Sequence, residues 1–246
     1  MTHIGLFEGI GGFSLAARWM GWNTLAYCEI NPFCLKILKH QFPNARAHED
    51  IRTTDFNVYR GQCDVLTGGF PCQDISIAGN GKGIYGIKSG LWSQYSRAIE
   101  EISPKYVIIE NSPQLLRKGF EKILYDLSEI GYDAEWECIS ASEFGFPHER
   151  KRLWIIAYPF IQGRRGFLHM LKGFNIEKNS KQRQNKKANS LDTQGNHFLR
   201  FEQSSGQPAV FGVDDGLPNR LDVVKRLGAI GNSIVPHIAY EIFKSI

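Results

Sequence analysis

HIGLFEGIGGFSLAARWM, residues 3–20, joins a short apolar strand to a helix through a glycine-rich turn. The strand is expected over residues 3–7, because the apolar run is followed at once by turn residues. Apolar residues at helical spacing then predict a helix from Phe13 to Met20, which Gly21 would end. A strand, a glycine turn and a helix in this order are typical of the first unit of an open α/β sheet.

The alternation of strand and helix continues along the chain. Asn31 can cap the next helix and Pro32 suits its first position, so this helix is expected to run to about His40. The other predicted strands are Thr24–Cys28, a segment ending at Asp50, Val65-Leu66, Val107–Ile109 and Leu153–Ala157, and the other predicted helices are Ile123–Ile130 and a terminal one from Ile234 to Phe243. This order implies βαβ units, and thus a doubly wound α/β domain with a mostly parallel sheet.

A basic segment interrupts this pattern. Between Tyr158 and Arg200 there are nine Lys or Arg and two acids, so the local charge is +7 and the rest of the chain carries −3. Such clustering favours a polyanion partner such as nucleic acid, although a solvated loop would have the same composition. We expect a main domain over residues 1–157, a short basic segment over 158–213 and a C-terminal segment over 214–246 that returns to the main domain.

Composition excludes several other classes of protein. The 42% hydrophobic and 22% charged content is that of an ordinary globular protein, and no apolar run is long enough to span a bilayer. The N-terminus lacks the basic and then apolar design of a signal peptide, so we expect a cytoplasmic protein without a membrane partner. The five cysteines are scattered and form no CxxC pair, which predicts neither a disulfide framework nor a metal site.

The glycine turn and the acid that follows the second strand predict a cofactor site. Glu29 lies 18 residues after Gly11, where a carboxylate can accept hydrogen bonds from two ribose hydroxyls. A dinucleotide fingerprint would have a third glycine where Ser14 stands, which favours S-adenosylmethionine over a nicotinamide cofactor. Asp50 could accept from an adenine amino group. The alternative is that the glycines serve only close packing of strand and helix.

Gly68-Gly69-Phe70-Pro71-Cys72-Gln73 follows another apolar strand and presents one cysteine directly after a proline. A thiol fixed at a strand end in this way is typical of a nucleophile, although a free cysteine can also be a small buried apolar residue.

Charged residues at two further strand ends are expected to lie near this cysteine. Glu110 ends the strand at 107–109, and a carboxyl beside apolar surface can donate a proton near neutral pH. Arg150 and Arg152 precede the last strand and, being two residues apart, point the same way in an extended chain. Such a pair suits a phosphate or a carbonyl oxygen. A structural ion pair for Glu110 and a solvated strand edge for the arginines are the alternatives.

Taken together, the ordered motifs resemble the DNA (cytosine-5)-methyltransferase family. The matching stretches are Leu6–Gly12, Glu29, Asp50-Ile51, Gly68–Gln73, Glu110-Asn111, Arg150–Arg152 and Gly231–Ser233. They cover residues 1–157 and 214–246, which would form the catalytic and cofactor-binding domain with its returning C-terminal segment. The resemblance implies the Rossmann-like fold of S-adenosylmethionine-dependent methyltransferases and methyl transfer to C5 of a flipped-out cytosine in a specific duplex DNA sequence.

The resemblance also implies roles for individual residues. Cys72 would be the nucleophile that adds to C6, Glu110 would hold or protonate N3, Arg152 would hold O2 and Arg150 would anchor a phosphate. Residues 73–90 would form a mobile lid. The cofactor pocket would be lined by Phe7, Gly9, Gly11, Glu29, Ile30, Asp50, Ile51, Pro71, Leu91, Asn232 and Ser233. The DNA contacts would come from Gln73, Ser76, Arg164, Arg165, Lys181, Arg183, Lys186 and Lys187. A monomer is expected, with a cognate restriction endonuclease as a functional rather than physical partner.

The chain departs from the family pattern at a few positions. The family has an acid where Gly5 stands, valine where Ser112 stands and glutamine where His148 stands, and we expect these changes to tune packing or lid contacts. The target-recognition region, about fifty residues over 158–213, is unusually short. An RNA cytosine-5 methyltransferase and a catalytically silent DNA-binding relative are the alternative functions.

Overall fold

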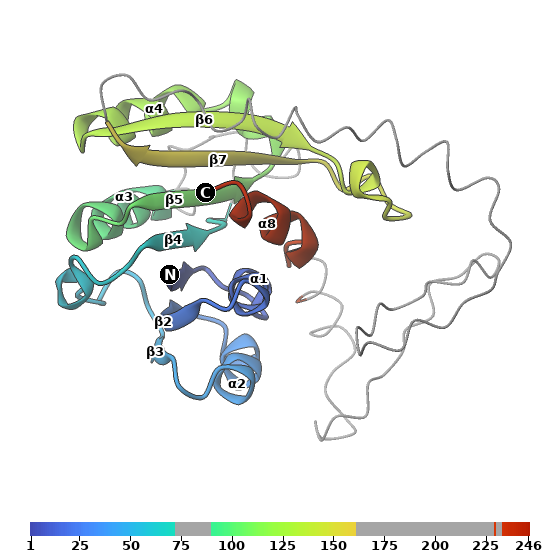
Figure 1. The fold of residues 1–246 in the computed structure, drawn as a ribbon. Helices are drawn as coiled ribbons and strands as arrows, with labels where there is room; N and C mark the ends of the chain where they lie inside the picture. The colour runs from blue at the N-terminus through green and yellow to red at the C-terminus, as the bar shows by residue number, and fades with distance from the viewer. Residues whose placement is uncertain (72–89, 161–228, 230–232) are drawn as a thin grey trace, which may run out of the picture.

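The computed structural model describes residues 1–71, 90–160, 229 and 233–246, and its centre is a sheet of seven strands (Figure 1). The strands lie in the order β3-β2-β1-β4-β5-β7-β6. Their bounds are β1 Thr2–Leu6, β2 Asn23–Cys28, β3 Arg46–His48, β4 Val65–Gly68, β5 Tyr106–Asn111, β6 Tyr132–Ile139 and β7 Arg152–Pro159. Strands β1 to β5 pair in parallel, which confirms the predicted mostly parallel sheet.

The hairpin of β6 and β7 departs from the predicted parallel units. β7 is antiparallel to both of its neighbours, and no strand is predicted over β6. Acidic residues alternate there with Ala134, Trp136 and Cys138. This alternation is typical of an edge strand and could have predicted β6. Because β7 runs backwards, its first residue, Arg152, lies at the edge of the sheet where the parallel strands end.

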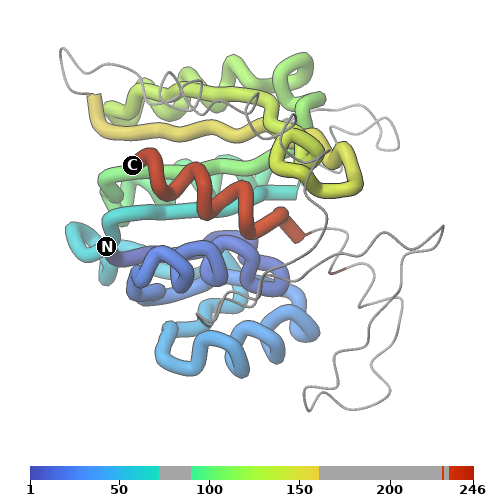
Figure 2. Tube along the Cα trace, turned by 45° about the vertical axis from the view of Figure 1, so that its right-hand side comes forward, coloured from blue at the N-terminus to red at the C-terminus, as the bar shows by residue number. Residues whose placement is uncertain are grey.

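Helices cover both faces of the sheet (Figures 1 and 2). On the front face in Figure 1 lie α1 (Gly12–Trp19), α2 (Pro32–Gln41) and α8 (Pro236–Phe243), and behind the sheet lie α3 (Leu91–Ile102) and α4 (Phe120–Glu129). Short 3₁₀ turns occupy η1 (Asn57–Tyr59), η3 (Pro113–Arg117) and η4 (Ala141–Phe144). The chain moves outward from β1 to β3 and then returns to β4, so the order of strands reverses between β1 and β4. Ligands bind at such a reversal in open α/β sheets.

Local signals explain where the predicted helices begin and end. The Asn31 side chain accepts from the N–H groups of Phe33 and Cys34, and Pro32 occupies the first turn, as predicted. Gly21 and Gly131 follow α1 and α4 with φ of 71° and 82°, which glycine adopts without strain. Helix α3 is not predicted, although Trp92, Tyr95 and Ile99 have helical spacing.

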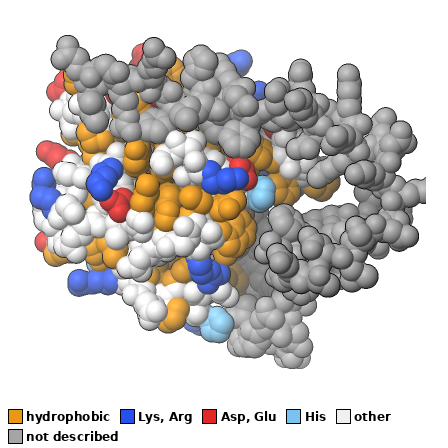
Figure 3. Space-filling view, in the orientation of Figure 1, with side chains coloured by type: hydrophobic (Ala, Val, Ile, Leu, Met, Phe, Trp, Pro, Cys, Tyr) orange, Lys and Arg blue, Asp and Glu red, His pale blue; other side chains and the backbone are white. Residues whose placement is uncertain are grey.

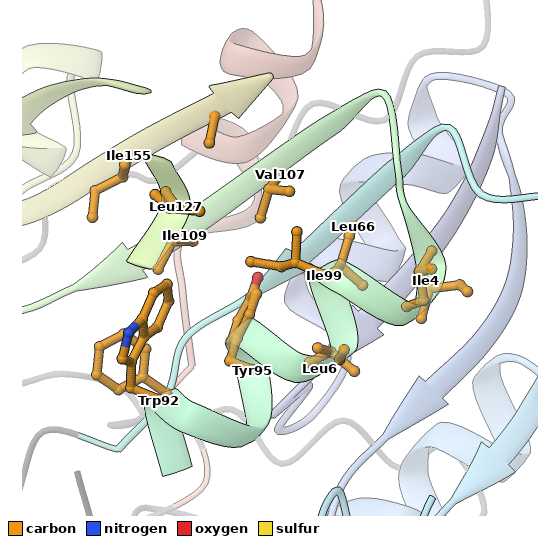
Figure 4. Close-up of a cluster of buried hydrophobic side chains, with 14 of the residues drawn as sticks. Ile4, Leu6, Leu66, Trp92, Tyr95, Ile99, Val107, Ile109, Leu127 and Ile155 are labelled. Atoms are coloured by element: carbon orange, nitrogen blue, oxygen red, sulfur yellow. The ribbon is translucent and has the colours of Figure 1, made fainter. Parts of the chain in front are cut away.

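Alternate residues of each central strand enter two separate cores. Behind the sheet, Leu66 and Ile109 pack with Trp92, Tyr95 and Ile99 of α3 (Figure 4). The intervening residues of the same strands face the front helices, in a second cluster formed by Val65, Ile108, Trp154, Phe13, Ile238 and Phe243. Partly buried apolar side chains also pack against this second cluster, and Figure 3 shows apolar side chains in the middle of the front face. The two cores hold the strand ends in a fixed register.

No helix in the part of the chain that the structure describes is long and apolar enough to cross a membrane. The three-part division of the chain stays a prediction, because most of residues 158–213 lies outside the described ranges. β7 itself continues to Pro159, past the expected boundary at residue 157.

Candidate cofactor and catalytic site

The ends of four strands meet at one edge of the sheet. Leu6 of β1 pairs with Cys28 of β2 and with Gly68 of β4. On the other side, Gly68 pairs with Ile109, and Asn111 at the end of β5 pairs with Leu153 near the start of β7. The glycine turn, Glu29, Glu110 and the arginine pair are therefore all carried to the same edge, as the sequence predicts.

The glycine turn after β1 has a strained residue at its start. Phe7 has a φ of 51°, which is unusual for a residue with a side chain, and its ring stacks on Tyr95 with centroids 6.1 Å apart. Gly9 follows with a φ of 59°, and a Cβ built on it would meet no atom within 4 Å. The backbone at Gly9 is thus open to close approach, as a bound cofactor requires.

Glu29 ties the glycine turn to the end of β2. Its Oε2 accepts from the Gly9 N–H at 2.7 Å, and its Oε1 accepts from the Asn31 N–H at 2.7 Å. Each carboxylate oxygen has a second lone pair, so both can still accept from a hydroxyl. This half-buried carboxylate, held in place beside the open backbone of Gly9, fits the vicinal hydroxyls of a ribose.

Two other glycines of the turn have a packing reason instead. A Cβ at Gly11 would lie 2.8 Å from the Phe42 ring, and one at Gly12 would lie 2.6 Å from the Ile234 side chain. The open space at Gly9 would admit a ligand close to the backbone, which stays a prediction, whereas Gly11 and Gly12 make room for Phe42 and Ile234.

Glu8 occupies the space where the family resemblance expects an acid on β1. A Cβ at Gly5 would lie 1.8 Å from Glu8 Oε2, so the two positions share one cavity. Glu8 is 4% exposed, and its Oε1 accepts from the Ser14 N–H at 2.8 Å. Burial raises the pKa of Glu8 to about 7, against the effect of the Ser14 hydrogen bonds. Gly5 thus changes the packing at this turn, and sequence reasoning missed Glu8 because its burial depends on the tertiary fold.

Asp50 lies beyond the end of β3 and is held by its neighbour Arg52. The Arg52 Nη2 lies 2.7 Å from Asp50 Oδ2, and the hydrogen bonds from Arg52 lower the pKa of Asp50. Of the two isoleucines expected to line the cofactor pocket, Ile51 is buried and Ile30 is 63% exposed.

An open hollow of about 630 Å³ lies beside Asp50. Of the expected cofactor residues only Asp50 lines this hollow.

Glu110 and Arg152 form an ion pair at the end of β5. Arg152 Nε lies 2.9 Å from Glu110 Oε1, although the N–H does not point squarely at the oxygen. Burial raises the pKa of Glu110, and the charges of Arg152 and Arg150 oppose that rise. Glu110 as a whole residue is 8% exposed. Arg150 donates from Nη2 to the Ser233 carbonyl at 2.6 Å, which links the arginine pair to the segment before α8.

The chain that leads to Cys72 is packed against this ion pair. A Cβ at Gly69 would lie 2.9 Å from Glu110 Oε2, so a side chain here would displace the Glu110 carboxyl. Asn111 donates from Nδ2 to the Phe70 carbonyl at 3.2 Å and accepts from the Ser112 N–H at 2.8 Å. The motif that contains Asn111 predicts no role for it, since its tether to Phe70 spans 41 positions along the chain.

Several predicted site residues lie outside the described residues. These are Cys72, Gln73, Ser76, Arg164, Arg165, Lys181, Arg183, Lys186, Lys187 and Asn232. Pro71 and Leu91 are described at the two borders of residues 72–89, and both are half-buried. In the described ranges no group of three or more His, Cys, Asp or Glu residues could hold a metal ion.

Solved structures share this fold. S. pombe Dnmt2 methyltransferase superposes with a TM-score of 0.58 and 21% identity, covering 70% of this chain and 55% of that one. Entamoeba histolytica methyltransferase EhMeth superposes with a TM-score of 0.58 and 20% identity, covering 67% and 55%.

Curated relatives and a family model agree with this likeness. The type II methyltransferase M2.BsuMI of Bacillus subtilis is 35% identical over 170 residues, which cover 65% of this chain and 42% of that protein. The type II methyltransferase M.CviJI of Paramecium bursaria Chlorella virus IL3A is 35% identical over 153 residues, covering 62% and 41%. The chain thus spans less than half of the length of these relatives. The family model for C-5 cytosine-specific DNA methylases matches residues 1–205, and the chain therefore belongs to the C-5 cytosine-specific DNA methylase family.

Proposed function

We propose that this chain transfers a methyl group from S-adenosylmethionine to C5 of a cytosine in duplex DNA, through a covalent bond between Cys72 and C6. The observation that carries the proposal is the 2.9 Å ion pair of Glu110 and Arg152, against which the segment leading to Cys72 is packed. A nucleophile, an acid and a guanidinium would thereby meet beside the open glycine turn.

We assign the cofactor to the edge formed by the glycine turn, Glu29 and Asp50. Glu29 would accept from the ribose hydroxyls, Gly9 would allow the close approach, and Asp50 with Ile51 would receive the adenine. Phe7, Gly11, Ile30, Pro71, Leu91, Asn232 and Ser233 would complete the pocket. When bound, S-adenosylmethionine supplies the electrophilic methyl group and leaves as S-adenosylhomocysteine.

The chain's own residues activate the base. The Cys72 thiolate adds to C6 and forms the S–C6 bond, while the electrons of the C5–C6 double bond move toward N3. Glu110 donates its proton to N3, for which a buried carboxyl with a raised pKa is suited. Arg152 would hold both the Glu110 carboxyl and the O2 carbonyl. After C5 takes the methyl group, N3 returns its proton to the Glu110 carboxylate. Water then accepts the C5 proton, the double bond between C5 and C6 re-forms, and the S–C6 bond breaks to restore the thiolate.

Duplex DNA is the proposed substrate. A stacked base cannot meet Cys72, so the cytosine must leave the helix. Arg150 would anchor a phosphate beside it, and Gln73, Ser76 and the basic residues of 158–213 would contact the DNA. We expect binding to weaken steeply with salt, in proportion to the phosphates neutralised.

The test is methyl transfer from labelled S-adenosylmethionine by the purified chain. Mixed-sequence duplex DNA is the acceptor, and digestion to nucleosides identifies the product as 5-methylcytosine. Cys72→Ser should abolish labelling and should still bind S-adenosylhomocysteine. Label on adenine, label on tRNA instead of DNA, or no label at all would contradict the proposal. The last two results correspond to the RNA-modifying and the catalytically silent alternatives.

The biological setting is proposed from the relatives. Similar proteins carry the name type II methyltransferase, and one from Bacillus phage SPR is named an orphan methyltransferase. We propose that a cognate restriction endonuclease is the functional partner and that the chain acts as a monomer in the cytoplasm. Base-resolution mapping of 5-methylcytosine in cells that express the chain would identify its target sequence. Resistance of that DNA to one endonuclease would identify the partner.

A further inference from the structure

Helix α3, behind the sheet, reaches across to the segment that follows Asp50. We propose that Arg97 of α3 is a positioning residue for the cofactor, because it clamps the backbone of residues 51–56 and so fixes Asp50 and Ile51 at the adenine. The inference rests on the proposed function, which assigns the adenine to that segment. Arg97 itself would not touch the cofactor.

The guanidinium of Arg97 binds two backbone carbonyls of this segment. Its Nη2 donates to the Ile51 carbonyl at 2.6 Å, and its Nη1 donates to the Thr54 carbonyl at 3.2 Å. Between these carbonyls the chain makes one tight turn, in which the Thr54 N–H and hydroxyl both bond the Asp50 carbonyl. Arg97 therefore holds the backbone of the turn, while the Asp50 carboxylate pairs with Arg52 and its side chain is 25% exposed.

Glu101, one helical turn further along α3, completes the clamp. Its Oε1 accepts from Arg97 Nη1 at 2.6 Å, and its Oε2 accepts from the Phe56 N–H at 2.9 Å. The guanidinium also lies over the Phe56 ring, 5.9 Å from its centroid. The ion pair is shielded, with 31% of the Arg97 side chain and 18% of the Glu101 side chain exposed. The Arg97–Glu101 pair thus binds both ends of residues 51–56, Arg97 at Ile51 and Glu101 at Phe56.

Arginine is required at position 97 because its hydrogen-bond acceptors are spread around the plane of the guanidinium. Its Nε donates to Gln94 while its two terminal nitrogens reach Ile51, Thr54 and Glu101. A lysine ammonium is a single point and cannot reach all of them in one conformation. The helix that carries the clamp is rigid, since Trp92, Tyr95 and Ile99 are almost fully buried against the sheet (Figure 4).

The variants Arg97→Lys and Glu101→Gln test the clamp in the full-length chain. Arg60→Lys is the matched control, because Arg60 also binds the C-terminal end of α3, at the Glu100 carbonyl and the Ser103 hydroxyl, rather than residues 51–56. The dissociation constant of S-adenosylhomocysteine is measured by calorimetry. The turnover number is measured at saturating S-adenosylmethionine, and the melting temperature reports folding.

We expect Arg97→Lys to raise the dissociation constant about tenfold and Glu101→Gln about threefold, as the loss of one or two charge-assisted hydrogen bonds predicts. Turnover at saturation should stay within about twofold of wild type, because the base-binding residues are untouched. Arg60→Lys should lower the melting temperature comparably and leave the dissociation constant unchanged.

The inference is overturned if Arg97→Lys and Glu101→Gln bind S-adenosylhomocysteine as wild type does. It is also overturned if all three variants lose affinity in proportion to their melting temperatures, since that is a general loss of stability. If Arg97→Lys does not fold, the comparison of Glu101→Gln with Arg60→Lys decides. A wild-type chain that fails to bind S-adenosylhomocysteine would instead refute the proposed cofactor site, and the inference with it.

Discussion

The Glu8 carboxyl fills the buried space beside Gly5, and the variant Gly5→Ala tests this packing directly. The new Cβ would lie 1.8 Å from Glu8 Oε2 and 2.7 Å from Glu8 Cδ, so the carboxyl must leave its place. The Ser14 N–H then loses the acceptor that now lies 2.8 Å away. Departure of a buried carboxylate also relieves its desolvation, which offsets part of the loss.

A buried donor left without its acceptor costs about 1–3 kcal/mol, and overpacking costs a similar amount. Because the relieved desolvation of the Glu8 carboxylate offsets part of this, we expect Gly5→Ala to lower the free energy of unfolding by about 1–3 kcal/mol. The assay is urea unfolding followed by tryptophan fluorescence and circular dichroism. Adding Glu8→Ala should restore at least half of the loss, because the collision is gone. Glu49→Ala is the matched control and should restore nothing, since Glu49 is exposed.

Two results would refute this reasoning. Unchanged stability of Gly5→Ala would mean that the Glu8 carboxyl does not fill the space beside β1. A double variant with Glu8→Ala that is as unstable as Gly5→Ala alone would mean that the strain lies elsewhere in the strand.

Three further predictions concern the same edge of the sheet. Burial raises the pKa of Glu8 from 4.5 to about 7, so its contribution to stability is full below pH 4.5 and is lost as pH rises to 7. Glu8→Gln should therefore remove about 3 kcal/mol of this pH dependence, measured by urea unfolding across pH 4–8. Glu110→Gln should slow methyl transfer by about 10²–10⁴-fold with S-adenosylhomocysteine affinity retained, and an unchanged rate would exclude it as the proton donor. Asn111→Ala, which releases the Phe70 carbonyl, should lower turnover by about tenfold without changing that affinity; rates equal to wild type would show that the tether is dispensable.

Much of the fold could be predicted because the signals are local. The helix caps at Asn31 and Gly131 depend on nearby residues only. The central strands are short apolar runs, because a strand that is covered by helices on both faces needs apolar side chains on both. β6 and α3 were not predicted. β6 is an edge strand whose residues are mostly half-buried or exposed, and α3 follows directly on the stretch expected to be a lid.

The sequence by itself determined the family, most of the strands and helices, and the identity of the residues expected at the site, because short motifs at fixed spacing carry that information. Only the tertiary structure decided which of these side chains touch. The antiparallel β7 brings Arg152 to Glu110, Glu8 fills the space above Gly5, and Arg97 holds the turn after Asp50. Each contact joins residues whose distance depends on how the elements pack, and packing is a property of the whole core rather than of any local stretch.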